Sequence, residues 1–214
     1  MSRVLFIFFA SYLLGSIPFG YLLVRIFRGE DVRLSGSGNI GATNVSRKSP
    51  VLGVLTLLLD ALKGTCAVLA ANQMFVRAAP GNVDDSLSFW LSLVALCAIL
   101  GHMFPVWLHF RGGKGVATSV GAFALLVPRA TLGAFAIFMI VALLSRYVSL
   151  ASIAAAASLP ILAWFSLRYR GSEGLMTLLP ITVASLLVIG KHHENIRRLF
   201  AGTENRFGSR REKS

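Results

Sequence analysis

Glycine and hydrogen-bond donors are concentrated at residues 35–47, which read SGSGNIGATNVSR. Glycine lets backbone N–H groups turn toward an anion, while hydroxyl, amide and guanidinium groups can add charge-assisted hydrogen bonds. A merely flexible loop is the alternative, but it would not need so many donors beside its glycines. We therefore predict a phosphate-binding loop formed by Gly36, Ser37, Gly38, Asn39, Gly41, Thr43, Asn44 and Arg47.

The same stretch also matches the G-x-G-x-x-G fingerprint of dinucleotide-binding folds, through Gly36, Gly38 and Gly41. That fingerprint needs a preceding strand and a following amphipathic helix that packs on a parallel sheet. Here a long apolar stretch precedes the glycines and another follows them. Asp60, which has the spacing of an acidic ribose ligand, falls inside the second stretch. We interpret the match as accidental.

A second glycine-rich segment occupies residues 101–119, GHMFPVWLHFRGGKGVATS. Lys114 is surrounded by Gly112, Gly113 and Gly115, and an apolar helix is expected to begin near Val116. Free amides at a helix start and a neighbouring lysine together favour phosphate binding. The segment is not a Walker A loop, because glycine follows the lysine where Ser or Thr is required. The alternative is a glycine break flanked by ordinary positive charge.

The third polar segment is GKHHENIRRLFAGTENRF, at residues 190–207. His192 and Asn195 share a face if the preceding helix continues through them. Glu194, Arg197 and Arg198 would then form a mixed charged surface. An amphipathic tail lying on anionic lipid is the competing interpretation.

Two ionisable residues, Asp60 and Lys63, lie one helical turn apart within an apolar stretch. Such residues are functional candidates by default, although a mutual ion pair that locks the structure is an equal alternative. The sequence lacks a His-x4-Asp acyltransferase box, a G-x-S-x-G elbow, an H-E-x-x-H zinc motif and paired cysteines. We therefore predict no metal and no cofactor, and neither covalent serine catalysis nor zinc hydrolysis is favoured.

The elements that must position these segments are membrane helices. Of the 214 residues, 55% are hydrophobic and 14% are charged, and the mean hydropathy is +0.71, which is too apolar for a soluble domain. We predict an all-α integral membrane protein, with residues 1–214 forming one membrane-embedded domain. Seven apolar segments are expected, the fourth and fifth short for the roughly 20 residues that cross a bilayer. They are residues 4–27, 50–75, 89–107, 116–127, 131–144, 148–165 and 175–189.

The net charge of +12 is unevenly distributed along these segments. Most basic residues lie after the first, third, fifth and seventh segments, and the positive-inside rule assigns those connections to the cytoplasm. The prediction is an N-terminus outside and a C-terminus in the cytoplasm, with all three polar segments on the cytoplasmic face. The charge suits anionic lipids and substrates better than nucleic acid, because no soluble basic face exists. The opposite side holds only Arg3, Arg77, Arg129, Arg168 and Arg170.

Taken together, GSGNIGATNVSR, GHMFPVWLHFRGGKGVAT and HHENIRRLFAGTENRF resemble, in order and spacing, the motifs of the PlsY family of bacterial membrane acyltransferases. The resemblance extends over essentially the whole chain, including DALKG at residues 60–64. It implies transfer of a fatty acyl group from acyl phosphate to the 1-hydroxyl of glycerol 3-phosphate, the first step of bacterial phospholipid synthesis. The matching catalytic residues are Ser37, Arg47, Lys114, His192 and Asn195, with Glu204 as a structural glutamate.

The resemblance also implies partners and a location. The partners are acyl phosphate, glycerol 3-phosphate and membrane lipids, with a functional link to the enzyme that makes acyl phosphate and to the next acyltransferase. The location is the bacterial inner membrane, with a cytoplasmic active site. His192 or the substrate's own phosphate is the base. A transporter or channel for phosphate or organophosphates is the alternative function, disfavoured because the polar residues gather at one face rather than at midplane.

Overall fold

The computed structural model describes residues 2–78 and 86–208, and all regular structure within them is helical. The all-α prediction is therefore confirmed for these residues. In chain order the elements are α1 (Ser2–Gly15), α2 (Phe19–Arg28), η1 (Val32–Leu34), α3 (Ala42–Val45), α4 (Pro50–Ala78), α5 (Leu87–Met103), η2 (Val106–Leu108), α6 (Val116–Leu126), α7 (Pro128–Ser145), α8 (Val148–Leu167), η3 (Arg168–Arg170), α9 (Gly171–Gly190) and α10 (His193–Phe200).

Six segments of the described chain are long and apolar enough to cross a membrane. The remaining predicted segment, the fourth, is α6, whose 11 residues form a helix only about 17 Å long. A hydrocarbon core is about 30 Å thick, so α6 has the length to cross only part of it. The six long segments are Ser2–Arg28, Pro50–Arg77, Leu87–Leu108, Pro128–Ser145, Val148–Leu167 and Gly171–Gly190.

The first apolar segment is broken near its middle, where the sequence predicts one continuous helix over 4–27. α1 ends at Gly15 and α2 begins at Phe19. Pro18 has no N–H to donate, and it disfavours helical geometry at Ile17, which explains the break. The ammonium group of Lys63, from α4, donates to the Ile17 carbonyl at 2.8 Å, so the break is tied to a neighbouring helix.

The fifth segment is longer than predicted. We expected 131–144, with Pro128 and Arg129 as a separator, but α7 begins at Pro128 and has 18 residues. Proline is favoured at the first helical position, because its missing N–H would have no partner there in any case. The same residue that separates α6 from α7 therefore starts α7 and gives it spanning length.

Glycines bring the helices around the site into close backbone contact. A Cβ placed on Gly121 of α6 would lie 1.9 Å from the Ala61 carbonyl oxygen of α4, and one on Gly64 would lie 2.3 Å from the Thr118 oxygen. Small residues allow such approaches between membrane helices, where packing rather than hydrophobicity drives association. α4 and α6 thus meet as a closely packed pair.

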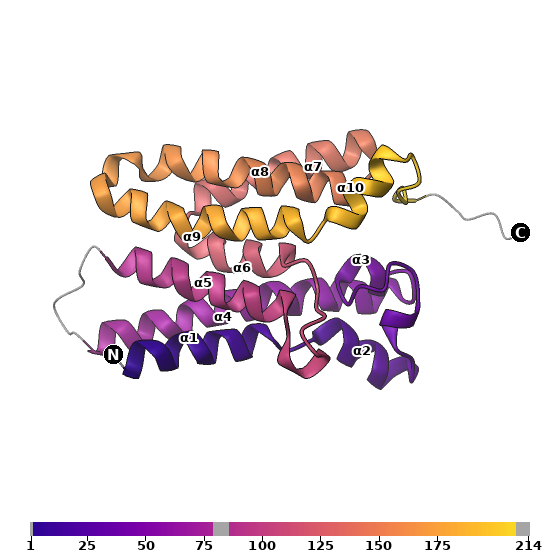
Figure 1. The fold of residues 1–214 in the computed structure, drawn as a ribbon, viewed down its shortest axis with the longest axis horizontal. Helices are drawn as coiled ribbons and strands as arrows, with labels where there is room; N and C mark the ends of the chain where they lie inside the picture. The colour runs from indigo at the N-terminus through magenta and orange to yellow at the C-terminus, as the bar shows by residue number, and fades with distance from the viewer. Residues whose placement is uncertain (1, 79–85, 209–214) are drawn as a thin grey trace, which may run out of the picture.

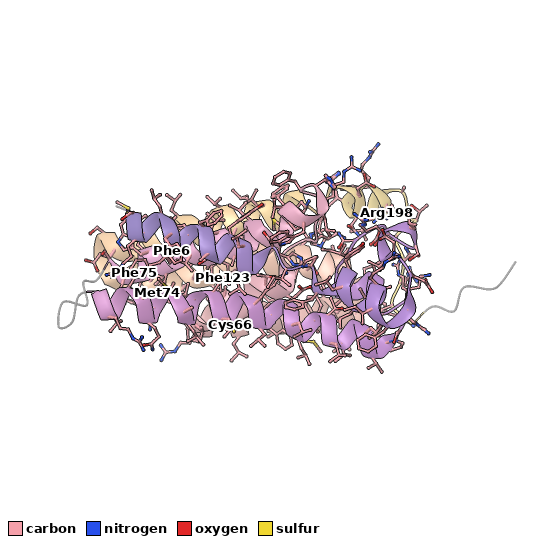
Figure 2. The ribbon with its side chains drawn as sticks, turned by 90° about the horizontal axis from the view of Figure 1, so that it is seen from below. Phe6, Cys66, Met74, Phe75, Phe123 and Arg198 are labelled. Carbon is pink, nitrogen blue, oxygen red and sulfur yellow. The ribbon has the colours of Figure 1, made fainter. Side chains whose placement is uncertain are left out.

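The helices run roughly parallel and antiparallel along one long axis, as Figure 1 shows. α2, α3 and α10 lie at one end, the loop between α5 and α6 lies beside α2, and α1 begins at the other end. In Figure 2, Arg198 lies at the first end, while Phe6 and Phe75 lie at the other. The fold therefore brings the three polar segments to the same end of the bundle.

Candidate active site

Residues of all three polar segments line one cavity of about 660 Å³. All five predicted catalytic residues line it: Ser37, Arg47, Lys114, His192 and Asn195. Of the other predicted site residues, the lining includes Gly36, Asn39, Gly41, Thr43, Asn44, Gly115, Asp60 and Glu204. Gly38, Gly112, Gly113 and Lys63 are outside the lining.

The first loop is organised by the side chain of Asn44, which is only 2% exposed. Its Nδ2 lies within hydrogen-bond distance of three backbone oxygens, on Val32, Ser35 and Asn39, at 2.9–3.0 Å. Its Oδ1 accepts from the Ser37 N–H at 3.0 Å. Because both ends of this amide bind backbone, Asn44 shapes the loop rather than offering free donors to a ligand. Ser37 and Arg47 remain exposed at the cavity surface.

Gly36 illustrates why this loop needs glycine. Its φ is +59°, and a Cβ there would lie 2.2 Å from Asn44 Oδ1. A side chain would therefore strain the backbone and also displace the amide that holds the loop.

The second loop folds back on the end of α5. The N–H of Gly113 donates to the His102 carbonyl at 3.0 Å, and that of Gly112 donates to the Met103 carbonyl at 3.2 Å. Gly115 then starts α6 with a φ of +83°. Gly112 and Gly113 thus bind the loop to the end of α5 and lie outside the cavity lining, whereas Lys114 lines the cavity.

Lys114 and the third segment meet through a chain of polar contacts. Lys114 Nζ donates to Asn195 Oδ1 at 2.5 Å, across 81 positions of sequence. Asn195 Nδ2 in turn donates to Glu204 Oε1 at 2.7 Å. The amide is thereby fixed with its oxygen toward the lysine, because its nitrogen faces the carboxylate.

Two residues that anchor Glu204 were not predicted. Ser149, near the start of α8, donates to Glu204 Oε1 at 2.8 Å, and Arg198 Nε donates to Oε2 at 2.7 Å. The sequence predicts Arg198 only as part of a charged surface. Ser149 carries no local motif, and its only signal is a serine at the polar end of an apolar segment. Burial opposes ionisation of Glu204, but the hydrogen bonds from Asn195, Arg198 and Ser149 hold its pKa below the usual range.

This anchoring gives a stability prediction. Glu204→Gln removes the charge that Arg198 binds, and we expect the free energy of unfolding at pH 7 to fall by about 1 kcal/mol. A carboxylate with a lowered pKa stabilises the fold above its unfolded pKa and loses that effect as pH falls through the folded pKa. The difference between wild type and variant should therefore disappear in acid. Thermal unfolding in detergent at pH 7 and below pH 4 would measure both.

Glu194→Gln is the matched control for that experiment. Glu194 lies 3.7 Å from the same arginine, Arg198, but its side chain is 64% exposed. Exposed ion pairs contribute little, so this variant should unfold like wild type. Equal destabilisation by the two variants would contradict the role given to Glu204.

Lys114 is partly removed from water. Burial lowers its pKa to about 8, against the opposing effect of Glu204. The side chain is therefore mostly protonated at neutral pH, so it presents a poorly hydrated positive charge to the cavity. Such a charge binds an anion more strongly than an exposed lysine does.

His192 is buried at the turn between α9 and α10. The shared helical face of His192 and Asn195 depended on the preceding helix continuing through them, and it does not, since α9 ends at Gly190 and α10 begins at His193. The two side chains still line the same cavity. His192 Nδ1 lies 2.7 Å from the Val188 carbonyl, which can only accept, so Nδ1 carries the proton and Nε2 is unprotonated. Burial, aided by Lys114, lowers the pKa of His192 to about 4.

Asp60 and Lys63 form the ion pair that was one of the two interpretations of their spacing. The ammonium lies 2.9 Å from Asp60 Oδ1, and both side chains are nearly inaccessible. Asp60 reaches the cavity lining, whereas Lys63 does not. Within residues 2–78 and 86–208, no cluster of three or more His, Cys, Asp or Glu could hold a metal ion.

Comparison with known proteins identifies the family. The glycerol-3-phosphate acyltransferase family model matches residues 5–202. A glycerol-3-phosphate acyltransferase of Syntrophotalea carbinolica is 47% identical over 209 residues, covering 97% of this chain and 99% of the relative. One of Geobacter sulfurreducens is 46% identical, covering 92% and 94%.

Two solved structures share the fold. Both are crystal structures of PlsY, described as an integral membrane glycerol 3-phosphate acyltransferase. The glycerol 3-phosphate form has a TM-score of 0.83 and 39% identity, with 96% of each chain covered. The lysophosphatidic acid form has a TM-score of 0.80 and 38% identity, with 96% of this chain and 95% of the other covered. This chain belongs to the PlsY family of integral membrane glycerol-3-phosphate acyltransferases.

Proposed function

We propose that the protein transfers a fatty acyl group from acyl phosphate to the 1-hydroxyl of sn-glycerol 3-phosphate. The hydroxyl oxygen attacks the acyl carbon, an ester bond forms, and the bond from that carbon to the phosphate oxygen breaks. The products are 1-acyl-glycerol 3-phosphate (lysophosphatidate) and inorganic phosphate, which keeps the hydroxyl proton. Acyl phosphate is already activated, so no covalent enzyme intermediate is needed.

The observation that carries this proposal is the contact between Lys114 and Asn195, which joins two polar segments inside a cavity that also holds Ser37 and Arg47. Both substrates bear phosphate, and a cationic cavity can hold the two anions together. Basic side chains in the lining outnumber acidic ones by five to two: Arg47, Lys48, Lys114, Arg198 and Arg206 against Asp60 and Glu204.

The cavity suits a reaction that depends on positioning and charge stabilisation. We assign Lys114, together with the free amides at the start of α6, to the acyl phosphate and to the charge that develops on the carbonyl oxygen and leaving phosphate. Arg47, Ser37, His192 and Asn195 are assigned to glycerol 3-phosphate. Holding the hydroxyl against the acyl carbon converts a bimolecular reaction into a local one, which alone can supply a large rate advantage.

The proton acceptor in this scheme is the phosphate of the substrate. A pKa of about 4 makes His192 a weak base at neutral pH, although its unprotonated Nε2 can still accept a hydrogen bond and orient the hydroxyl. His192→Gln is accordingly expected to keep measurable turnover. Between pH 7 and 5.5, kcat/KM should depend on pH in the same way in the wild type and in His192→Gln. Complete loss of turnover in the variant, with glycerol 3-phosphate still bound, would favour a histidine base.

The reaction itself is tested with detergent-purified protein. Phosphate release that requires both acyl phosphate and glycerol 3-phosphate, with formation of lysophosphatidate, is the expected result. Acyl-CoA offered in place of acyl phosphate should give no product. Robust turnover with acyl-CoA would overturn the assigned donor while leaving the acyltransferase class intact.

We also propose that the chain makes seven crossings, with α6 as a short one, in the bacterial inner membrane. Basic residues occur in the connections near the cavity: Arg28 ends α2, Lys48 follows α3, Arg111 lies between α5 and α6, and Arg146 joins α7 to α8. This distribution favours the cytoplasm for that end of the bundle. The water-soluble substrate would then enter from the cytoplasm, and acyl phosphate and product would be exchanged with the enzymes that act before and after. Labelling of single cysteines in intact and opened cells tests this: Ser37→Cys should react only after opening.

A further inference from the structure

Three ionisable side chains are buried together beneath the Lys114 loop, and the scheme above uses none of them. Asp60 and Lys63 come from α4, and His102 comes from the last turn of α5. Their side chains are only 5%, 1% and 4% exposed. Lys63 Nζ lies 2.9 Å from Asp60 Oδ1, and His102 Nδ1 lies 3.5 Å from the same oxygen. One carboxylate oxygen therefore faces both an ammonium and an imidazole.

On one side this cluster is fixed to the break in the first membrane segment. The ammonium of Lys63 donates to the Ile17 carbonyl at 2.8 Å, between α1 and α2, and lies 5.7 Å from the centre of the Phe19 ring. A buried ammonium costs free energy unless it keeps close polar partners. Lys63 is thus constrained by Asp60 and by the backbone at the break at the same time.

On the other side the cluster supports the second loop. A Cβ built on Gly113 would lie 2.0 Å from His102 Nε2, so the Gly113 backbone rests directly on the imidazole ring. The Gly113 N–H also donates to the His102 carbonyl at 3.0 Å. Lys114 is the next residue, so the ring position determines where the lysine backbone lies.

We propose that Asp60, Lys63 and His102 are positioning residues that fix the Gly112–Lys114 loop relative to the break in the first membrane segment. The inference rests on the proposed function, because it gives this loop the acyl phosphate. The cluster contacts no reacting atom in this scheme. It acts through Gly113, and its loss displaces Lys114 from the anion that the lysine holds.

Hydrogen–deuterium exchange of the full-length protein in detergent tests the positioning directly. In His102→Ala, the amides of residues 111–117 should exchange at least about tenfold faster than in wild type, because the ring beneath Gly113 is gone. The amides of α8 should be unchanged. His102→Asn keeps a nitrogen facing Asp60 and should show a smaller effect. His109→Asn, an exposed histidine of the same loop outside the cavity lining, is the matched control and should match wild type.

Steady-state kinetics of the same variants separate positioning from general stability. Misplacement by about 1 Å can cost about 100-fold in rate, so kcat/KM for acyl phosphate should fall steeply in His102→Ala. The KM for glycerol 3-phosphate should stay within about twofold, since its assigned ligands lie on other segments. A variant that unfolds at lower temperature but keeps the wild-type exchange pattern at 111–117 would overturn the proposal.

Gly113→Ala alters the contact between Gly113 and the His102 ring from the side of the loop. This variant replaces His102→Ala in the experiment if His102→Ala does not fold. Its Cβ must displace the ring, so fast exchange at 111–117 is expected, and adding His102→Ala to Gly113→Ala should partly reverse the loss of kcat/KM. Strict additivity of the two changes would contradict the proposal. If wild type fails to use acyl phosphate, the proposed function fails, but the exchange pattern still decides whether His102 fixes the loop.

Discussion

Lys114→Met is expected to lower kcat/KM for acyl phosphate by about 10²–10³-fold, as loss of a preorganised charge at the reacting centre does in other enzymes. The lysine is the cation that joins two polar segments, through Asn195. Its pKa is lowered to about 8, so the folded state disfavours the charged form. Removing the charge should therefore not destabilise the protein, and thermal unfolding measured beside the kinetics should show a similar Tm.

The pH profile gives a second signature of the same residue. Because the free enzyme loses the Lys114 proton at about pH 8, kcat/KM should fall by about tenfold per pH unit above that value. Bound phosphate favours the protonated amine, so kcat should fall at higher pH than kcat/KM does. Arg111→Met removes an exposed positive charge three positions earlier and should leave the profile unchanged. If kcat/KM of Lys114→Arg still fell above pH 8, the fall would have to be assigned to another group.

Gly121→Ala is expected to cost about 2 kcal/mol of stability, despite the preference of helices for alanine over glycine. The added Cβ would lie 1.9 Å from the Ala61 carbonyl oxygen, and backbone cannot move aside as a side chain can. α6 and α4 would have to separate. Because α6 begins immediately after Gly115, this shift should also lower kcat. Thermal unfolding and activity measured on one preparation would show the two losses together.

Gly133→Ala is the matched control on α7. The three atoms nearest to its Cβ would all belong to the Leu162 side chain, at 3.0–3.9 Å, and a leucine can adopt another rotamer. This variant should be as stable as wild type or slightly more so, in line with the higher helix propensity of alanine. If both substitutions lowered the Tm equally, close packing of α4 on α6 would not be the cause.

The sequence predicts those features of the fold that depend on hydrophobic composition and on the length of apolar runs. Long apolar runs predicted the helices, and six of them have spanning length. The errors lie at prolines. The hydrophobic pattern continues through Pro18, so the sequence predicts one continuous helix there. The pattern stops at Pro128, so the sequence predicts a separator between two helices there. In the structure the proline ring decides each case, by breaking a helix at one and starting a helix at the other.

For the site, the sequence identified the segments but not how they contact one another. Ser37, Arg47, Lys114, His192 and Asn195 line one cavity, as their shared end of the bundle led us to expect. Ser149 could not have been found, since its bond to Glu204 spans 55 positions and no local pattern encodes it. The sequence predicts Asn44 as a ligand, because a buried amide and an exposed one look the same in sequence. Only the fold shows that its hydrogen-bonding capacity is used by the loop.

The segment that follows α10 has a consequence for how the protein matures during synthesis. Phe207 and Arg146 are joined by two backbone-directed hydrogen bonds, Phe207 N–H to the Arg146 carbonyl at 2.7 Å and Arg146 Nε to the Phe207 carbonyl at 3.2 Å. These bonds hold residues 204–208 along the cavity wall. A ribosome must therefore translate at least to residue 208 before the wall can close. Nascent chains that still lack this segment would lack part of the cavity wall, so the site can be completed only at the end of synthesis.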